Sequence, residues 1–463
     1  MQRRRVHTRR DIGRLIMTTE THARSNNVVG DHAIRLADNL NAFSRSDLER
    51  LRDTNLQTMV AAARNSPSVN RRWPELDRVS HPSELTRLPI LTPQDLAGGS
   101  PPGSEEFLMD GGKSGLVIRS SGTSGLNKVL YHSWEFTRQV NRLGARGIHA
   151  AAPPLPRRVA NCMHPAELGG AFTFVQDVLQ LVPALAFPLG NKPSMAHIAE
   201  LVREHGIDTI VSSPSHGAEL VATETAATVP HLRRLLYMGE PVGQARRDAI
   251  AAVAPELTVR SFAYSTTETG PIGYQCAHIS AAEHHVHEDA VVVEIVDEST
   301  GEPVPAGRPG AVVVTPLATT GMALFRYRIG DRGRMDPPGC ACGSQTQRLT
   351  LLGRIGQTLI VDTWKVSSDQ LLERLAALGV LDPADCQFQV LWEFPHYRVR
   401  LLLSPRTPTG ITTAAVAESL HEAHHIHQVI TGPRCVEFTV ERRGLEEFAQ
   451  TERNKVPVLY QRM

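Results

Sequence analysis

The feature of this sequence that most constrains its fold is a helical pattern followed at once by a buried strand pattern. In residues 194–215, Ile198, Leu201 and Val202 recur at helical spacing, and Gly206 follows them as a typical helix end. The run IDTIVSS comes next and is typical of a buried strand. The segment therefore predicts an α/β unit within a sheet.

Two further apolar runs end directly in short polar loops. LLYM leads into the tripeptide GEP at 239–241, and VRSFA leads into Tyr264. The carboxyl ends of parallel strands meet at one edge of a sheet, where ligands of α/β proteins usually bind. We therefore expect these loops to form part of a ligand site.

Other segments predict different local structure. An amphipathic helix is expected from Ser46, where Ser46 and Glu49 have the spacing of a capping box. AVVVEIV and GAVVVT flank a DESTGE turn in residues 290–315 and predict an antiparallel hairpin. After Arg354 we expect an α+β tail of about 110 residues, long enough for its own core. Its expected elements are a helix near 369–378, the strands QFQVLWEF, YRVRLLLS and CVEFTVE, and a long helix near 412–427.

Charge and composition exclude several classes of function. The 463 residues carry 49 Lys+Arg against 48 Asp+Glu, so the chain lacks the positive excess of a general nucleic-acid or membrane-surface binder. The sequence has no apolar run long enough to span a membrane. Six cysteines are too few for a disulfide scaffold, and we expect a cytoplasmic protein.

The first segment, MQRRRVHTRRDIGRLIM, is rich in arginine. A transit peptide or a phosphate-binding arm is one interpretation. The interpretation we favour is a disordered or peripheral extension over residues 1–40, or an upstream start with Met17 as the true first residue, because the segment is short and contains Asp11.

Residues 119–128, RSSGTSGLNK, form a candidate phosphate loop. Glycines permit close backbone approach, so that successive N–H groups can converge on an anion. Hydroxyl side chains add donors and Lys128 adds positive charge. The segment lacks the Walker pattern, and an ordinary Ser/Gly connector is the alternative.

Several short motifs occur in a fixed order along the chain. They are SSGTSGLNK at 120–128, GEP at 239–241, YSTTE at 264–268, YRIGD at 327–331, GR at 353–354 and TERNK at 451–455. With them, the chain resembles the adenylate-forming superfamily of acyl-CoA synthetases and AMP-binding enzymes, most closely its phenylacetate–coenzyme A ligase-like branch. The resemblance covers roughly residues 40 to 463.

The resemblance implies an α/β fold with two parts. A large N-terminal AMP-binding domain, with layered α/β sheets and a hairpin or barrel-like part, is expected over residues 41–354. A small, mobile α+β cap is expected over 355–463. The sequence leaves the oligomeric state open, with a dimer as one option.

The activity implied is ATP-dependent adenylation of a small, aromatic carboxylic acid. Pyrophosphate leaves, and the acyl group of the acyl-AMP passes to coenzyme A. The alternatives are transfer to an amine, a carrier thiol or another small nucleophile, and a nucleotide-binding homologue that has lost catalysis. ATP and Mg²⁺ are the implied cofactors.

By resemblance, a set of loop residues would bind the nucleotide. Tyr264 would stack on adenine, Asp331 would accept hydrogen bonds from the ribose hydroxyls, and Arg354 would contact ribose or phosphate. The full set is Ser121, Gly122, Thr123, Ser124, Gly125, Lys128, Gly239, Glu240, Pro241, Tyr264, Ser265, Thr266, Thr267, Asp331 and Arg354. For Asp331 and Arg354 taken singly, a surface ion pair is the alternative.

Three residues would carry the chemistry. Glu268 is the implied Mg²⁺ ligand, with a solvated loop carboxylate as the alternative. Lys455 would neutralise charge on the α-phosphate, and Thr123 would act from the phosphate loop. An ordinary solvated lysine is the alternative for Lys455, so its role rests mainly on the resemblance.

Acid specificity is expected from HPAELGGAFTF at 164–174 and SPSHG at 213–217, the segments that form the acyl pocket in relatives. The candidates are His164, Phe172 and His216, with core packing as the alternative for each.

Cysteines and histidines also form a candidate metal site. Cys340 and Cys342 make a C-x-C turn, Cys276 precedes them, and His285 lies in a histidine cluster between. Three thiolates and one imidazole suit tetrahedral zinc, and some members of the resembled branch carry structural zinc at matching positions. The alternative is a group of small thiols with no ligand.

The sequence departs from the family pattern in the YSTTE loop, at the hinge and in the cap. Ser265 replaces a glycine, and Gly356 replaces the expected hinge carboxylate. In DTWKVSS at 362–368, Thr363 stands where a glycine normally lets the pantetheine arm pass, and Trp364 follows. This last change puts the coenzyme A half-reaction in question.

Overall fold

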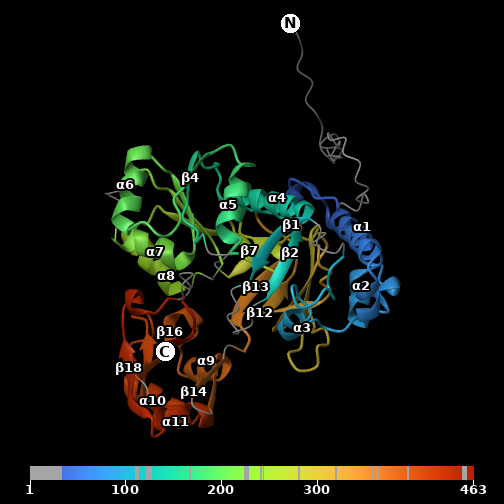
Figure 1. Ribbon diagram of the computed structural model, residues 1–463. Helices are drawn as coiled ribbons and strands as arrows, with labels where there is room; N and C mark the ends of the chain where they lie inside the picture. The colour runs from blue at the N-terminus through green and yellow to red at the C-terminus, as the bar shows by residue number, and fades with distance from the viewer. Residues whose placement is uncertain are drawn as a thin grey trace.

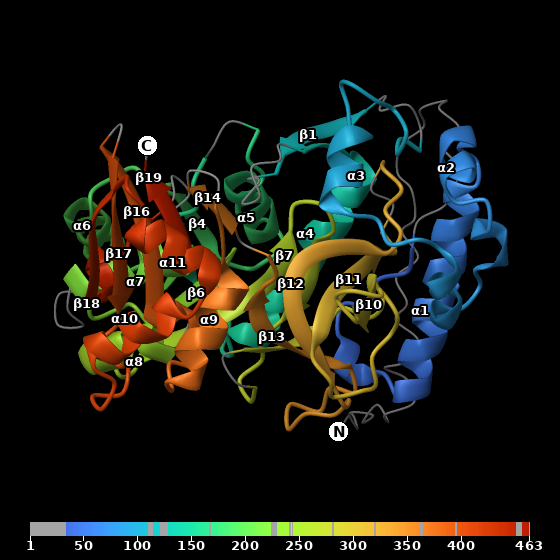
Figure 2. The same ribbon diagram turned by 90° about the horizontal axis from the view of Figure 1, so that it is seen from below.

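A computed structural model of the chain (Figures 1 and 2) describes most of the sequence. The described residues are 34–109, 114–120, 128–165, 168–223, 229–239, 242, 244–279, 282–318, 321–356, 358–361, 364–393, 396–450 and 456–462. The predicted N-terminal extension therefore lies mostly outside them. Among the described helices, none combines the length and apolar character needed to cross a bilayer.

One large sheet organises the N-terminal part, with the strand order β10-β11-β12-β13-β9-β8-β7-β6-β5-β3-β4. One half is parallel: β4 (Leu185–Pro188), β3 (Arg158–Asn161), β5 (Thr209–Ser212), β6 (Arg234–Met238) and β7 (Thr258–Thr266). The other half is antiparallel: β8 (Gly270–Tyr274), β9 (Glu283–Val286), β13 (Arg348–Arg354), β12 (Tyr327–Asp336), β11 (Gly310–Pro316) and β10 (Val291–Val296). The predicted strands and the hairpin of 290–315 are confirmed.

Helices cover both faces of the parallel half. Val211 and Leu236 pack in a cluster with α4 (Trp134–Ala151) and α5 (Ala171–Leu179). Their neighbours Ile210 and Leu235 pack in another with α6 (Met195–His205), α7 (Pro214–Thr223) and α8 (Gln244–Val253). Adjacent strand residues face opposite sides, so the apolar runs are buried on both. Gly206 ends α6 with a φ of 57°, as the sequence predicts.

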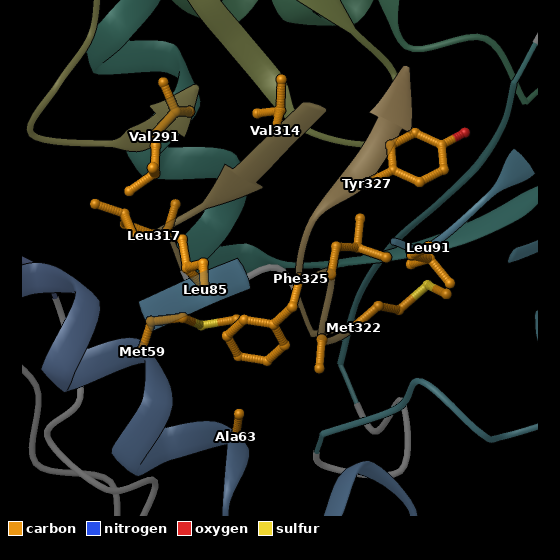
Figure 3. Packing of buried hydrophobic residues seen from close by; sticks show 14 of the residues in the cluster. Met59, Ala63, Leu85, Leu91, Val291, Val314, Leu317, Met322, Phe325 and Tyr327 are labelled. Carbon is orange, nitrogen blue, oxygen red and sulfur yellow. The ribbon is translucent and has the colours of Figure 1, made fainter. Parts of the chain in front are cut away.

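The antiparallel half encloses the largest core cluster with the N-terminal helices (Figure 3). Met59 and Ala63 of α1 (Arg45–Ala63) point toward Phe325 and the strand residues beyond it. The shorter helices of this region are α2 (Pro67–Arg72) and α3 (Pro93–Gly98), with 3₁₀ turns at Leu40–Ala42, Leu76–Arg78 and Pro82–Arg87.

The predicted capping box of α1 is wrong by two residues. Ser44 is the N-cap and forms the box with Asp47, so that Ser46 lies inside the helix. The sequence SRSDLE offers the pattern twice, and the extended backbone of Ser44 decides between them.

The C-terminal part has its own sheet and core, with the strand order β18-β17-β16-β19. Its strands are β16 (Cys386–Glu393), β17 (His396–Leu403), β18 (Cys435–Arg442) and β19 (Leu459–Arg462), and a hairpin of β14 (Thr358–Val361) and β15 (Trp364–Ser367) lies beside them. Its helices are α9 (Ser368–Ala377), α10 (Thr413–His421) and α11 (His424–Thr431), with 3₁₀ turns at Pro383–Asp385 and Leu445–Glu447.

The expected helix at 412–427 is wrong as a single element, because the extended backbone of Ala423 separates α10 from α11. The α/β fold class with a smaller C-terminal α+β part is confirmed. The boundary at Arg354 stays a prediction.

Candidate active site

Strands β7, β12 and β13 bring Tyr264, Asp331 and Arg354 together. The loop expected to begin at Tyr264 begins later, because β7 continues to Thr266. Asp331 of β12 lies opposite Arg354 of β13, and the Arg354 guanidinium donates to Asp331 Oδ1 at 2.9 Å. The Tyr264 hydroxyl donates to Asp331 Oδ2 at 2.5 Å. Burial and the neighbouring Asp331 carboxylate raise the pKa of Tyr264 well above its usual value, so the phenol remains a donor.

Gly330 lets this group assemble. Its φ is +85°, a conformation that favours glycine, and a Cβ there would lie 3.3 Å from an Arg354 guanidinium nitrogen. The glycine of YRIGD therefore gives Arg354 room to reach Asp331.

A second polar group joins the candidate phosphate loop to Glu268. The loop leaves β1 (Gly115–Arg119) and returns into β2 (Val129–Ser133), and the Ser120 N–H donates to the Lys128 carbonyl at 2.9 Å. Lys128 Nζ lies 2.8 Å from Glu268 Oε1, with both side chains 8% exposed. The Tyr327 hydroxyl donates to the same oxygen at 3.2 Å. A buried carboxylate thus faces a cation beside the loop.

A cavity of about 170 Å³ lies against the YSTTE motif. Its lining is mainly apolar and comes from the β1–β2 hairpin, α4, α5 and the segment after β3. Ser265, Thr266 and Thr267 of the YSTTE loop line it from the side of Glu268. The YSTTE motif therefore lines an apolar cavity with three residues and carries the buried carboxylate of Glu268 directly after them.

Of the three predicted acid-pocket residues, the structure places one in the lining of the cavity. His164 lines the cavity, and its Nδ1 lies 2.8 Å from Asn191 Oδ1. Phe172 on α5 and His216 on α7 are not among the described residues that line it. Their contact with an acid stays a prediction.

Sequence reasoning missed other lining side chains, among them His132, Phe136, Asn141 and Phe174. His132 carried a usable signal, because it lies two residues after Leu130 on the strand that leaves the phosphate loop and therefore shares the face of that apolar residue. Phe174 of α5 lies within the predicted segment 164–174 but was not singled out there. The residues of α4 carried no signal, since only the packed fold brings that helix to the hairpin.

Some predicted residues lie outside the described part of the chain. They are Ser121, Gly122, Thr123, Ser124, Gly125, Glu240, Pro241, Thr363 and Lys455. Gly239, which follows β6, has a φ of 95°. Ser265 is not among the described non-glycine residues with positive φ, so its replacement of a glycine strains no backbone here.

The candidate metal ligands do come together. One donor atom from each of Cys276, His285, Cys340 and Cys342 lies within 4.8 Å of the others. Cys276 Sγ and Cys340 Sγ are 3.7 Å apart, and Cys342 Sγ lies 3.4 Å from His285 Nε2. His285 Nδ1 lies 2.9 Å from Thr346 Oγ1, which leaves Nε2 for a ligand. This donor set fits tetrahedral zinc.

Comparison with known proteins agrees with this geometry. The model of the family described as AMP-binding enzyme matches residues 49–320. A phenylacetate–coenzyme A ligase of Thermus thermophilus is 25% identical over 358 residues, covering 74% of this chain and 78% of that protein. The enzyme of the same name from Escherichia coli is 23% identical over 359 residues, covering 75% and 80%.

A solved structure shares the fold. The crystal structure of a 2-hydroxyisobutyryl-CoA ligase in complex with 2-HIB-AMP superposes with a TM-score of 0.66 at 18% identity, covering 91% of this chain and 90% of that one.

The chain belongs to the AMP-binding enzyme family. The predicted phenylacetate–coenzyme A ligase-like branch of the adenylate-forming enzymes is confirmed, as is the class of ATP-dependent acid ligases.

Proposed function

We propose that this enzyme adenylates a small aromatic carboxylic acid with ATP and passes the acyl group to coenzyme A. The observation that carries the proposal is that one short motif, YSTTE, contributes to both the cavity and the buried ion pair. Ser265, Thr266 and Thr267 line the apolar cavity, and Glu268, the next residue, faces Lys128. An acid in the cavity would present its carboxylate to a nucleotide on the other side of this motif. The carboxylate would attack the α-phosphorus, pyrophosphate would leave, and a thiolate would then displace AMP from the acyl carbon.

The nucleotide would lie along the Tyr264–Asp331–Arg354 group. Each Asp331 oxygen accepts one hydrogen bond in the structure and retains a lone-pair site for a ribose hydroxyl. The Tyr264 ring would stack on adenine. The remaining contacts proposed are those of residues 121–125 and Lys128 with the phosphates, residues 239–241 with adenine, and Lys455 with the α-phosphate.

Glu268 fits a role as Mg²⁺ ligand, because its buried carboxylate already faces a cation. Magnesium would supply charge neutralisation at the leaving pyrophosphate. Zinc at Cys276, His285, Cys340 and Cys342 would be structural, since these residues tie β9 to the loop between β12 and β13.

The cavity supports an acid with a single ring. An apolar cavity of about 150 Å³ lined by Leu, Ile and Phe binds benzene, and this one measures about 170 Å³. Leu116, Ile118, Phe136 and Phe174 supply a comparable lining. The two phenylacetate–coenzyme A ligases reported above favour the same class of acid.

Coenzyme A remains the proposed acceptor despite Trp364. The indole packs edge-on against His424 and His425 of α11, at ring distances of 5.4 and 5.8 Å. Trp364 therefore packs against a helix of the C-terminal part itself. Of the two residues that argued against a path for the pantetheine arm, this leaves Thr363. The six cysteines form no disulfide with one another, in keeping with the proposed cytoplasmic location.

Pyrophosphate release across a panel of aryl and alkyl acids, with ATP and Mg²⁺, tests the proposal. We expect release that depends on the acid and accelerates with coenzyme A. Acid-dependent release without acceleration would favour an amine or a carrier thiol as acceptor. Nucleotide binding without release for any acid would favour a homologue that has lost catalysis.

A further inference from the structure

One face of the β1–β2 hairpin lines the acid cavity. In the antiparallel register Leu116 lies opposite His132, and Ile118 lies opposite Leu130. Leu116, Ile118 and His132 all line the cavity. Among the three hairpin residues that line the cavity, His132 is therefore the polar one.

The hydrogen bonds of His132 define which ring atom remains available. One ring nitrogen bonds to the Thr267 backbone, while Nε2 is buried and has no hydrogen-bond partner among the described residues. The ring is held edge-on by Phe136, with centroids 4.7 Å apart. The residue is only 8% exposed.

Burial also fixes the charge of this ring. Desolvation lowers the pKa of His132 to about 4, although the Thr267 bond and the Glu268 charge oppose the shift. The imidazole is therefore neutral near pH 7. With Nδ1–H donating to the Thr267 carbonyl, Nε2 carries a lone pair and acts as an acceptor.

Asn141 supplies a second acceptor on the same cavity. Its side chain lines the cavity from α4, the residue is 9% exposed, and its Oδ1 has no hydrogen-bond partner among the described residues. Leaving a buried acceptor unpaired is unfavourable. A ligand that donates a hydrogen bond to Asn141 Oδ1 would remove this free-energy cost, whereas a purely hydrocarbon ligand would leave the oxygen unpaired.

We propose that His132 and Asn141 select acids that carry a hydroxyl or N–H donor on their apolar body. This inference rests on the proposed function, and it narrows the substrate class from aryl acids to aryl acids with a polar ring substituent. A neutral acceptor does not bind the substrate carboxylate, so that group remains directed toward the nucleotide. His132 acts here as a specificity-determining residue.

Matched acid pairs test the inference: phenylacetate against its 3- and 4-hydroxy derivatives, and benzoate against hydroxy- and aminobenzoates. We measure kcat/KM from pyrophosphate release, and dissociation constants by calorimetry with a nonhydrolysable ATP analogue. For at least one pair, the wild type is expected to favour the donor-bearing acid by roughly 10- to 100-fold in both measurements.

Variants assign the preference to the ring nitrogen. His132→Phe keeps the aromatic volume and should abolish the preference, whereas His132→Gln keeps an acceptor and should retain part of it. His149→Phe is the matched control, because His149 is an exposed histidine of α4 that is not among the described residues lining the cavity. It should leave the ratio within each pair unchanged. If His132→Phe does not fold, the ratio within each acid pair is compared between His132→Gln and the wild type. A reduced ratio supports the role of His132, and an unchanged ratio contradicts it.

The outcomes separate this inference from the proposed function. Equal kcat/KM and equal affinity within every pair overturn the selectivity and leave the adenylation intact. A preference that survives His132→Phe and Asn141→Leu also overturns it. Absence of acid-dependent release and of acid binding for every acid overturns the proposed function itself.

Discussion

Removing the Lys128 ammonium should destabilise the nucleotide-free enzyme, and Mg²⁺ with ATP should compensate. Lys128 Nζ lies 2.8 Å from Glu268 Oε1, and both side chains are 8% exposed. Breaking a buried ion pair by removing one partner costs about 3–5 kcal/mol. The Tyr327 hydroxyl still donates to Glu268, which offsets about 1 kcal/mol. We therefore expect Lys128→Met to lower the free energy of unfolding by about 2–4 kcal/mol.

Urea unfolding with and without Mg·ATP measures this effect. If Glu268 binds the metal, Mg·ATP supplies the missing cation, and the gain in stability should be larger for Lys128→Met than for wild type. The double variant Lys128→Met/Glu268→Gln removes both charges of this pair and should be more stable than Lys128→Met alone. Lys192→Met, at an exposed position, is the control. A Lys128→Met protein as stable as wild type, or one that Mg·ATP stabilises no more than wild type, would refute the reasoning.

Other variants test the remaining parts of the site. Asp331→Asn should raise the KM for ATP by roughly 10- to 100-fold, because hydrogen bonds to a charged acceptor contribute about 1.5–3 kcal/mol; initial rates over an ATP series check this, and an unchanged KM would argue against ribose binding. Cys342→Ser should abolish the roughly one equivalent of zinc expected by metal analysis of the wild type, and equal zinc in both proteins would exclude this cluster as the site. Burial lowers the pKa of His132 to about 4, below its unfolded value of about 6.5. The unfolded chain therefore binds more protons between these values, and stability should fall as pH drops through that window, by about 3 kcal/mol for this residue. Urea unfolding from pH 7 to 4 should show a shallower loss for His132→Phe, and identical slopes would contradict the neutral buried ring.

Much of the fold could be predicted from the sequence because its signals are local. The strands of the parallel half are apolar runs, since residues such as Ile210 and Val211 are buried on opposite faces. Gly206 marks the end of α6 because its positive φ favours glycine. Where local signals were ambiguous, prediction failed. Two overlapping capping boxes misplaced the start of α1, and no glycine or proline marks the break at Ala423.

The candidate site was predictable where motifs carry it and unpredictable where tertiary packing builds it. Tyr264 and Asp331 are 67 positions apart along the chain, yet each ends or lies in a recognisable motif. The cavity wall combines the β1–β2 hairpin with α4 and α5, and its composition depends on how these elements pack. Phe174 lines the cavity whereas Phe172, two residues earlier on α5, is not among its described lining residues. Side chains two positions apart on a helix point to different sides of it, and the apolar sequence AFTF does not show which side faces the cavity.

Isotope transfer from the acid to AMP tests the adenylation mechanism most directly. An acid that supports turnover is labelled with ¹⁸O in its carboxylate, and AMP is analysed by mass spectrometry after reaction with ATP, Mg²⁺ and coenzyme A. Attack of the carboxylate on the α-phosphorus leaves one acid oxygen in AMP when the acyl carbon is released, so we expect AMP carrying one ¹⁸O. Unlabelled AMP, or label in inorganic phosphate with formation of ADP, would contradict an acyl-adenylate.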